Sequence, residues 1–330
     1  MLEENKLVIG VDEAGYGPSM GPLTICATAW RVPHSFDVTS MSELLEPEFI
    51  AKPIRPDSIH IPIGDSKKIN RDRFGIEGLC LGSRFLCFEV DGVDLIDWDR
   101  TLYGFASHDW TRIQDVPWYA LGNPSSDDRL GQLVADRIAY FDRGSQKLRS
   151  LSLRLIGIRM RVLDEPEFNR QVDIIGNKSS VLSETSLMLV RDVIATFAEP
   201  DESVEVYCDK HGGRNRYQGV LSHCFEQEWF AIEVEGKNCS RYTSSWRGHP
   251  IRIQFKVDGD SIFPSAAASI IAKWTREELM GRLNGFWRSK VSNGIEPTAG
   301  YYVDALRFAE QIESTAIELE LCREKWWRKK

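Results

Sequence analysis

The segment that most constrains the fold is an apolar run, Leu7–Val11, which ends at two adjacent acids and a glycine-rich turn, Ala14–Pro18. Leu-Val-Ile-Gly-Val is rich in β-branched residues and therefore predicts a buried strand. Asp12 and Glu13 come at the carboxyl end of that strand, a frequent position for chemistry in α/β proteins. Because adjacent side chains of a regular strand point to opposite faces, the two acids can share a ligand only if the strand stops or bulges there.

The turn that follows has the residues for a sharp change of direction. Gly15 and Gly17 permit backbone conformations closed to other residues, and Pro18 and Pro22 keep the next segment extended. The same residues also fit an ordinary polar transition from strand to loop. Taken alone, the octapeptide Val11–Pro18 leaves both interpretations open.

Composition narrows the class of protein. The chain has 330 residues, of which 42% are hydrophobic, enough for one large domain or two ordinary ones. Its seven cysteines are odd in number and form no Cys-x-x-Cys pair, which favours reduced thiols in the cytoplasm over a disulfide framework or a zinc site. No run resembles a membrane span or a signal peptide.

The net charge of −8 argues against a uniformly basic nucleic-acid binder. It does not exclude a local basic groove, and a site with several carboxylates becomes less negative when divalent metals bind.

Apolar runs and helical periodicities alternate along the chain and predict one α/β or α+β domain around a central sheet. After Leu7–Val11, the expected strands cover 23–32, 151–163, 204–208 and 251–257. The expected helices cover 70–80, 178–197, 264–283 and 303–327. From 85 to 150 the pattern is irregular and predicts an insertion, with a helix at 129–141; the stretch 212–252 predicts an enlarged hairpin region and 285–330 a helical C-terminal region.

Three of the expected strands end in acids: Asp12-Glu13, Asp209 and Asp260. Carboxylates gathered at one end of a sheet make an oxygen-rich site suited to Mg2+ or Mn2+. Two such ions, about 4 Å apart, would orient water and stabilise a leaving oxygen in phosphodiester hydrolysis. Structural roles stay open as well, since Asp209 could cap the turn that follows it and Asp260 could begin a turn or cap a helix.

Four blocks of the sequence resemble, in the right order, the signatures of type 2 ribonucleases H, the ribonuclease HII family. The opening signature is similar to Val11–Pro22 and the second to Asp65-Ser66-Lys67-Lys68. Asp209 follows the expected strand, and Asp260–Arg276 is similar to the third signature. Together these blocks span most of the chain, which makes the resemblance more specific than any single motif.

The resemblance implies a ribonuclease H-like fold, a central mixed sheet flanked by helices and followed by a helical C-terminal region. It implies that Asp12, Glu13, Asp209 and Asp260 are the catalytic carboxylates and hold two metals, Mg2+ or Mn2+. The implied reaction cleaves RNA within an RNA–DNA hybrid, or within duplex DNA containing a ribonucleotide, and leaves 5′-phosphate and 3′-hydroxyl ends. The implied substrate contacts are Gly15, Tyr16, Gly17, Ser66, Lys67, Lys68 and Tyr301. No membrane association and no protein partner are predicted.

Two positions depart from the family pattern. Tyr16 stands where the family has arginine, which removes a phosphate-binding fork that tyrosine does not replace. Gly300-Tyr301 is the counterpart of a family Gly-Tyr pair, although its flanking residues fit poorly and an ordinary loop tyrosine is the alternative. Cleavage at a single embedded ribonucleotide is therefore less certain than metal binding. Two other functions stay open: a nuclease with a different nucleic-acid substrate, and a noncatalytic nucleic-acid-binding protein on the same fold.

The stretch after Asp209 interleaves basic and aromatic residues. Such a pattern could hold phosphates and stack bases, or could be a solvated hairpin with ordinary surface charges. The residues concerned are Lys210, His211, Arg214, Arg216, Lys237, Arg241, Tyr242, Trp246, Arg247 and His249.

Overall fold

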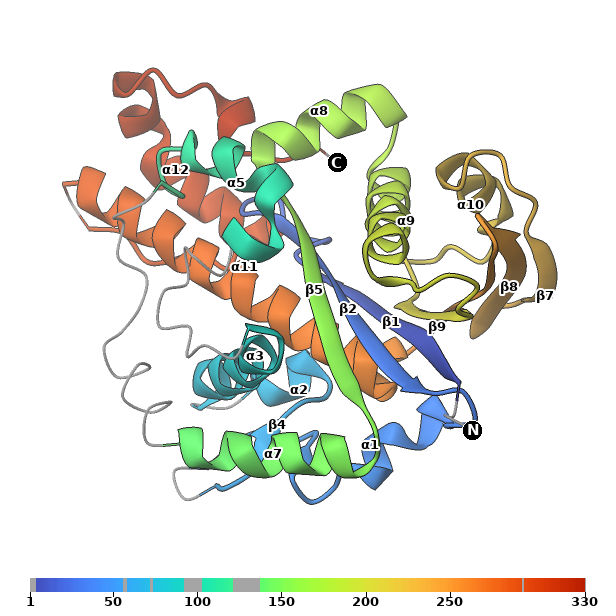
Figure 1. The fold of residues 1–330 in the computed structure, drawn as a ribbon. Coiled ribbons are helices and arrows are strands. Elements are labelled where there is room, and N and C mark those ends of the chain that lie inside the picture. Colours follow the sequence, from blue (N-terminus) through green and yellow to red (C-terminus); the bar gives the residue numbers. More distant parts are fainter. Residues whose placement is uncertain are drawn as a thin grey trace.

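A computed structural model describes residues 4–55, 58–71, 74–91, 103–120, 137–292 and 294–329. Its centre is a seven-stranded sheet with the strand order β5-β2-β1-β6-β9-β8-β7 (Figure 1). The strands are β1 (Asn5–Ala14), β2 (Leu23–Pro33), β5 (Arg154–Leu163), β6 (Val204–Asp209), β7 (Ala231–Glu235), β8 (Cys239–Trp246) and β9 (His249–Lys256). A second, two-stranded sheet pairs β3 (Phe49–Ile50) with β4 (Ile61–Pro62).

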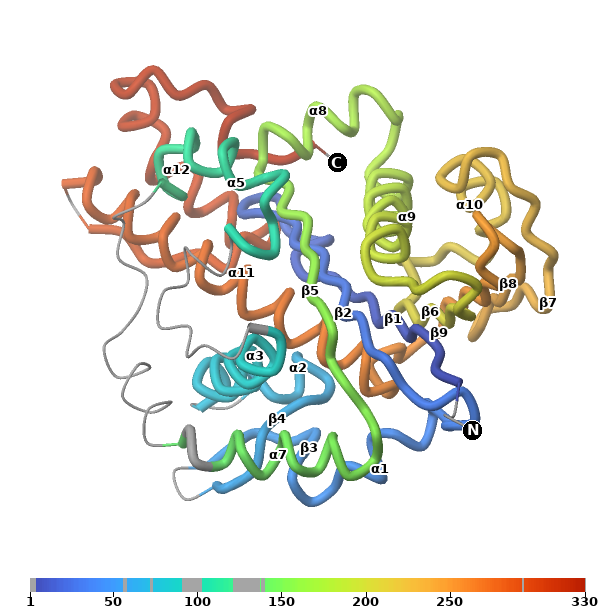
Figure 2. Tube along the Cα trace, viewed as in Figure 1, coloured from blue at the N-terminus to red at the C-terminus, as the bar shows by residue number. Residues whose placement is uncertain are grey.

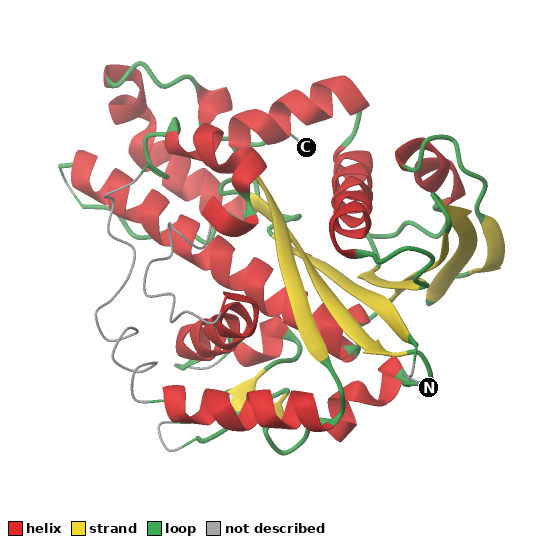
Figure 3. Cartoon of the chain, in the orientation of Figure 1, coloured by secondary structure: helices red, strands yellow, loops and turns green. Residues whose placement is uncertain are grey.

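Helices lie on both sides of the central sheet (Figure 3). They are α1 (Met41–Leu44), α2 (Ser66–Ile69), α3 (Gly75–Asp91), α5 (Ser107–Gln114), α7 (Ile138–Ser150), α8 (Glu165–Ile175), α9 (Lys178–Phe197), α10 (Gln218–Cys224), α11 (Phe263–Lys290) and α12 (Tyr302–Glu318). Short 3-10 turns are η1 (Val38–Ser40), η2 (Gly259–Ser261) and η3 (Arg323–Lys325).

The sheet is mixed. β2 runs antiparallel to both β1 and β5, whereas β1, β6 and β9 run parallel to one another. β8 and β7 then continue the sheet as antiparallel strands beyond β9. The predicted fold class, a central mixed sheet flanked by helices with a helical C-terminal region, is confirmed.

Each face of the sheet buries its own apolar cluster. Val8 of β1 packs in the cluster that includes α11 and α3, while Leu7 and Ile9 pack in the cluster that includes α9. This alternation follows from the two-residue period of a strand. The faces of β1 are therefore assigned: even-numbered residues face α11, and odd-numbered residues face α9.

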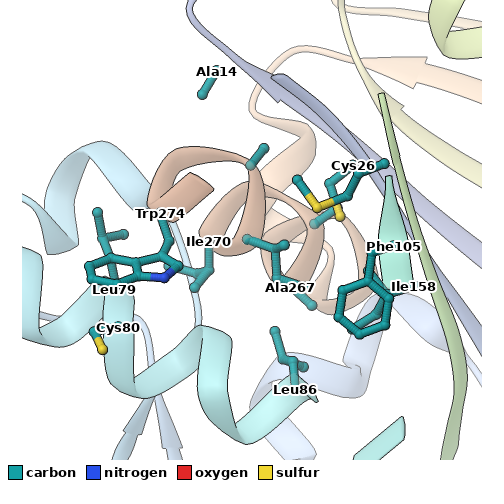
Figure 4. Packing of buried hydrophobic residues seen from close by; sticks show 14 of the residues in the cluster. Ala14, Cys26, Leu79, Cys80, Leu86, Phe105, Ile158, Ala267, Ile270 and Trp274 are labelled. Carbon is teal, nitrogen blue, oxygen red and sulfur yellow. The ribbon is translucent and has the colours of Figure 1, made fainter. Parts of the chain in front are cut away.

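Helix α11 crosses the sheet at very short range. A Cβ atom placed on Gly10 would lie 2.0 Å from the carbonyl carbon of Pro264, so only glycine permits the helix to approach β1 there. Figure 4 shows Ala267 of α11 between Cys26 of β2 and Leu86 of α3, and Ile270 of the same helix beside Trp274. The small residues of α11 thus let a helix sit within the core.

Most expected elements are present, with shifted ends. The helix expected at 178–197 is α9, with the same ends, and the helix expected to reach about 283 is α11, which continues to Lys290. The expected strand 7–11 is longer, because pairing with β2 continues through Ala14.

Two helical expectations were inaccurate. The helix expected at 70–80 is α3, which begins at Gly75 and runs into the region expected to be irregular. The helix expected to run to 327 ends at Glu318, and Glu320 has a φ of 55°, which a helix does not allow. Of the helix expected at 129–141, residues 129–136 lie outside the described residues, and α7 begins at Ile138. Among the described residues, no helix is long and apolar enough to cross a membrane.

Replacement of Gly10 by alanine is expected to destabilise the fold by about 3 kcal/mol or more, because the new methyl group collides with the backbone of α11. Gly219→Ala is the matched control. Gly219 lies in α10 with no atom within 4 Å of an added Cβ, so that variant is expected to gain up to about 1 kcal/mol. Urea denaturation followed by circular dichroism measures both, and equal effects of the two substitutions would contradict the close approach.

Candidate active site

Asp12 and Asp209 lie side by side at the ends of two parallel strands. The pairing of β1 with β6 ends at Val11 and Cys208, and the two acids are the next residue on each strand. Residues paired across neighbouring strands point to the same face, and for β1 that face is the one covered by α11. The parallel register therefore puts both carboxylates over the start of α11.

Asp260 joins them from the turn that follows β9. The Gly259 amide donates to Oδ1 of Asp209 over 3.1 Å, and a Cβ on Gly259 would lie 2.8 Å from the Asp209 Cα atom. Asp260 is the next residue, within η2, three residues before α11 begins at Phe263. The turn therefore packs directly on the end of β6 and brings a third acid to this edge.

Glu13 has a different placement. β1 pairs with β2 through Glu13 and Ala14, so the strand neither stops nor bulges at the acids, which was the condition for the two to share a ligand. Strand alternation then directs Glu13 to the face opposite Asp12, although the Glu13 amide donates to Oδ1 of Asp12 over 2.8 Å. Glu13 is half-buried and close enough to the other acids to feel their charge.

Burial and mutual repulsion raise the pKa values of these acids. Burial, with the nearby charge of Asp209, raises the pKa of Asp12 to about 7, and burial, with Asp65 and Asp209, raises the pKa of Asp260 to about 6. Burial followed by the charges of Asp12 and Asp209 also raises the pKa of Glu13 well above its usual value. Burial raises the pKa of Asp209 as well. The group thus carries a charge that it stabilises poorly by itself.

The Asp65–Lys68 segment packs against the same edge. Asp65 caps α2 by accepting from the Lys67 and Lys68 amides at 2.9 and 3.2 Å. Ser269 of α11 donates a hydrogen bond to the Asp12 carboxylate, which lowers the pKa of Asp12, and its hydroxyl oxygen lies 2.9 Å from the Ser66 hydroxyl oxygen. The positive charge of Lys67 favours the ionised forms of Glu13, Asp209 and Asp260 by lowering their pKa values. Lys68 also lowers the pKa of Asp260, so the second motif places two cations near the carboxylates.

The glycine turn that contains Gly15 and Gly17 lies beside Tyr301, one of the predicted substrate contacts. Gly15 has a φ of 88°, and a Cβ on Gly17 would lie 3.9 Å from Cε1 of Tyr301. The amides of Ser19 and Met20 donate to the Gly300 carbonyl at 2.8 and 3.2 Å. Tyr301 stays 57% exposed. Two segments almost 300 residues apart thus form one surface, with Gly17 and Tyr301 both open to solvent.

Tyr16 has neighbours that sequence reasoning missed. The Lys178 ammonium lies 5.3 Å from the centre of the Tyr16 ring, and a Cβ on Gly212 would lie 3.7 Å from the ring. Below the turn, the guanidinium of Arg328 donates to the carbonyls of Gly15 and Tyr16 at 2.6 and 3.1 Å. No local pattern in the sequence distinguishes Lys178 or Arg328 from ordinary surface charges.

Two side chains of the basic and aromatic stretch that follows Asp209 are buried. Lys210 is buried and donates to Asn215 Oδ1 at 2.7 Å and to the Gly236 carbonyl at 2.6 Å. His211 is buried against Tyr217, and burial lowers its pKa to about 3. These two residues hold the loop together and are buried from solvent, so the nucleic-acid-binding interpretation that was left open for this stretch does not extend to them.

The donor chemistry of the edge fits a hard divalent cation, because carboxylates that repel one another gain from a shared positive charge. As the side chains lie, however, no three His, Cys, Asp or Glu residues of the described part of the chain form a group that could hold a metal ion. The four-carboxylate metal set therefore stays a prediction.

Comparisons with known proteins find only distant likeness. No family model matches the chain, and no curated protein matches it significantly. Among solved structures, it is similar to a Bst ribonuclease HIII in complex with Mn2+, with 14% identity, a TM-score of 0.43 and coverage of 99% of this chain and 67% of that one. It is also similar to a ribonuclease HII of Archaeoglobus fulgidus in complex with PCNA, with 14% identity, a TM-score of 0.41 and coverage of 97% of this chain and 93% of that one. A third similar structure is ribonuclease H2 of Pyrococcus horikoshii OT3, with 14% identity, a TM-score of 0.40 and coverage of 97% of this chain and 92% of that one. These likenesses are too distant to assign an activity.

The raised pKa of Asp12 predicts how stability depends on pH without metal. A carboxyl group whose folded-state pKa of about 7 exceeds the usual 3.8 stabilises the fold most at low pH, and this contribution is lost as the pH rises through 7. Asp12→Asn is therefore expected to be more stable than the unchanged protein at pH 8 by about 2 kcal/mol, and the gain should vanish near pH 4.

Asp37→Asn is the control with the opposite sign, because hydrogen bonds from Thr39 lower the pKa of this exposed carboxyl. That variant is expected to lose stability at pH 8. Urea titrations in EDTA at pH 4, 6 and 8 measure both variants. If the stability gain of Asp12→Asn does not grow with pH, the conclusion that the fold raises the pKa of Asp12 is wrong.

Proposed function

We propose that the protein is a metal-dependent endonuclease that hydrolyses the RNA strand of RNA–DNA hybrids. The observation that supports it most is the gathering of Asp12, Asp209 and Asp260 at the ends of parallel strands, with pKa values raised by burial and mutual repulsion. A stable fold gains nothing from such a group, because each buried charge costs free energy. A bound cation would remove that cost, which favours a catalytic role over a structural one.

Asp12, Asp209 and Asp260 are the residues proposed to hold Mg2+ or Mn2+. Glu13 is proposed as the fourth ligand, because the charges of Asp12, Asp209 and Lys67 all act on its carboxylate even though strand alternation turns the residue away from Asp12. When bound, two such ions would activate a water for attack on phosphorus and stabilise the leaving oxygen. The residues of the chain position this chemistry: the Gly259 amide fixes the Asp209 carboxylate, and Ser269 fixes Asp12. Lys67 supplies positive charge beside the acids, where a substrate phosphate would lie.

The substrate would extend from the carboxylates over the glycine turn. Gly15 and Gly17 let backbone approach a ribose, whose 2′-hydroxyl distinguishes RNA from DNA. Exposed Lys67 and Lys68 lie on the α2 side, and Tyr301 lies beside Gly17. Tyr16 lies against Lys178 and, unlike an arginine, has no guanidinium with which to bind a phosphate through two hydrogen bonds. We therefore propose weak selectivity for a single embedded ribonucleotide.

Asp209→Asn is expected to lower the cleavage rate at least about a hundredfold, because it removes a ligand charge and keeps the side-chain shape. Asp258→Asn is the matched control. Asp258 is exposed, two residues from Asp260, and its φ of 56° is one that asparagine also accepts, so its rate should stay within about twofold. Single-turnover cleavage in Mg2+ and in Mn2+ measures both. Unchanged cleavage by Asp209→Asn would reject the proposed site.

The substrate class is tested with four matched duplexes or strands: a long RNA–DNA hybrid, DNA with one ribonucleotide, single-stranded RNA and duplex DNA. Hybrid cleavage is expected to be fastest, with at least about tenfold slower cutting at a single ribonucleotide. Preferential cutting of duplex DNA would favour a nuclease with another substrate. Tight hybrid binding without cleavage in either metal would favour a noncatalytic binding protein.

A further inference from the structure

Arg328 connects residues 322–329 to the glycine turn from below. Its guanidinium donates to the carbonyls of Gly15, Tyr16 and Gly21 at 2.6, 3.1 and 3.3 Å. Its own amide donates to the Ser19 carbonyl over 2.8 Å. One residue thus bonds to four carbonyls of the segment 15–21, and only 1% of Arg328 is exposed.

The segment that carries Arg328 is anchored on α8. The side-chain amide of Asn169 donates to the carbonyls of Glu324 and Trp327 at 3.0 and 2.9 Å, and it accepts from the Lys329 amide at 2.7 Å. In Figure 2 the chain beyond α12 runs back to α8. The guanidinium itself lies 4.0 Å from the centre of the Phe168 ring, also on α8. Arg328 is therefore held in place both by the backbone on either side of it and by its guanidinium.

The turn depends on such contacts from outside. Gly15 and Gly21 have φ values of 88° and 84°, which belong to neither a strand nor a right-handed helix. Among the described residues, no backbone hydrogen bond joins two residues of segment 15–21. The Gly21 amide donates to buried Glu165 over 2.9 Å, and a Cβ on Gly15 would lie 2.5 Å from the Arg276 side chain. The turn therefore rests on a buried polar base in which Arg328 makes the largest number of the hydrogen bonds just described.

We propose that Arg328 is a positioning residue that holds the Gly15–Gly21 turn in the shape that receives the substrate. The inference deepens the proposed function and, for its kinetic part, rests on it. A guanidinium suits the role because its planar fork bonds several carbonyls at once, whereas a lysine ammonium is a point charge. The carboxylates at the strand ends do not touch Arg328, so its loss is expected to alter substrate binding more than the chemical step.

The first test needs no substrate. Amide hydrogen exchange of segment 15–21 is compared in the full-length protein, in Arg328→Ala and in Lys329→Ala, the control whose side chain only pairs with exposed Asp173. In Arg328→Ala, exchange of the turn is expected to speed up about tenfold or more while residues 7–11 of β1 stay protected. Arg328→Lys is expected to be intermediate and Lys329→Ala unchanged.

The second test measures cleavage of the RNA–DNA hybrid. Arg328→Ala is expected to raise KM about tenfold with kcat within about threefold, since a loose turn binds poorly and the carboxylates are intact. Asn169→Ala, which frees the anchored segment without touching the turn, is expected to show the same pattern more weakly. It also decides the question if Arg328→Ala does not fold.

Unchanged exchange of segment 15–21 in a folded Arg328 or Asn169 variant would overturn the inference, and so would a loss confined to kcat. If the unaltered protein cleaves no hybrid, the proposed function fails, while the exchange experiment still decides the role of Arg328. Faster exchange throughout the protein would assign Arg328 to general stability and would also reject the positioning role.

Discussion

The parallel alignment of β1, β6 and β9 is the constraint on which the rest of the site depends. Parallel strands end at the same edge of the sheet, so the acids that follow them are brought together even though their negative charges repel. The register ends at Val11 and Cys208, which leaves Asp12 beside Asp209. The free energy of packing in the adjacent core, where α11 contacts β1 at Gly10, offsets the repulsion between the two carboxylates. The apolar cluster thus holds in place a charged group that would otherwise separate.

Sequence patterns predicted the elements that are decided locally. The apolar runs that end at Asp12, Asp209 and Asp260 marked the strands, and the strand ends gave the candidate acids. The end of β1 was mistaken because Asp12 and Glu13 are polar, whereas pairing with β2 keeps them in the sheet. The expected helix to 327 failed for a similar reason: its periodicity continues past Glu318, but contacts with α8 draw the chain away.

Arg328 and Lys178 could not be found from the sequence, because their importance comes from distant contacts. A run of tryptophans, arginines and lysines is typical of a solvated segment, and nothing local indicates that Arg328 reaches residues more than 300 positions earlier. Lys210 and His211 mislead in the other direction, since basic residues beside aromatics suggest a nucleic-acid surface and here fill the interior. The exposed cations that remain near the acids, Lys67 and Lys68, belong to α2.

Helix α11 has one further consequence. Its Ser269 contacts Asp12, and its Arg276, seven residues later, lies under Gly15 and donates to the Ala299 carbonyl over 2.9 Å. Both contacts belong to one continuous helix and lie about 10 Å apart along its axis. A sliding of α11 would therefore move its contact with Asp12 and its contact with Gly15 by the same amount. The distance between the carboxylates and the Gly15 turn is thus set by one continuous helix, whereas side chains around the turn, such as Tyr16 and Tyr301, can be exchanged without changing that distance.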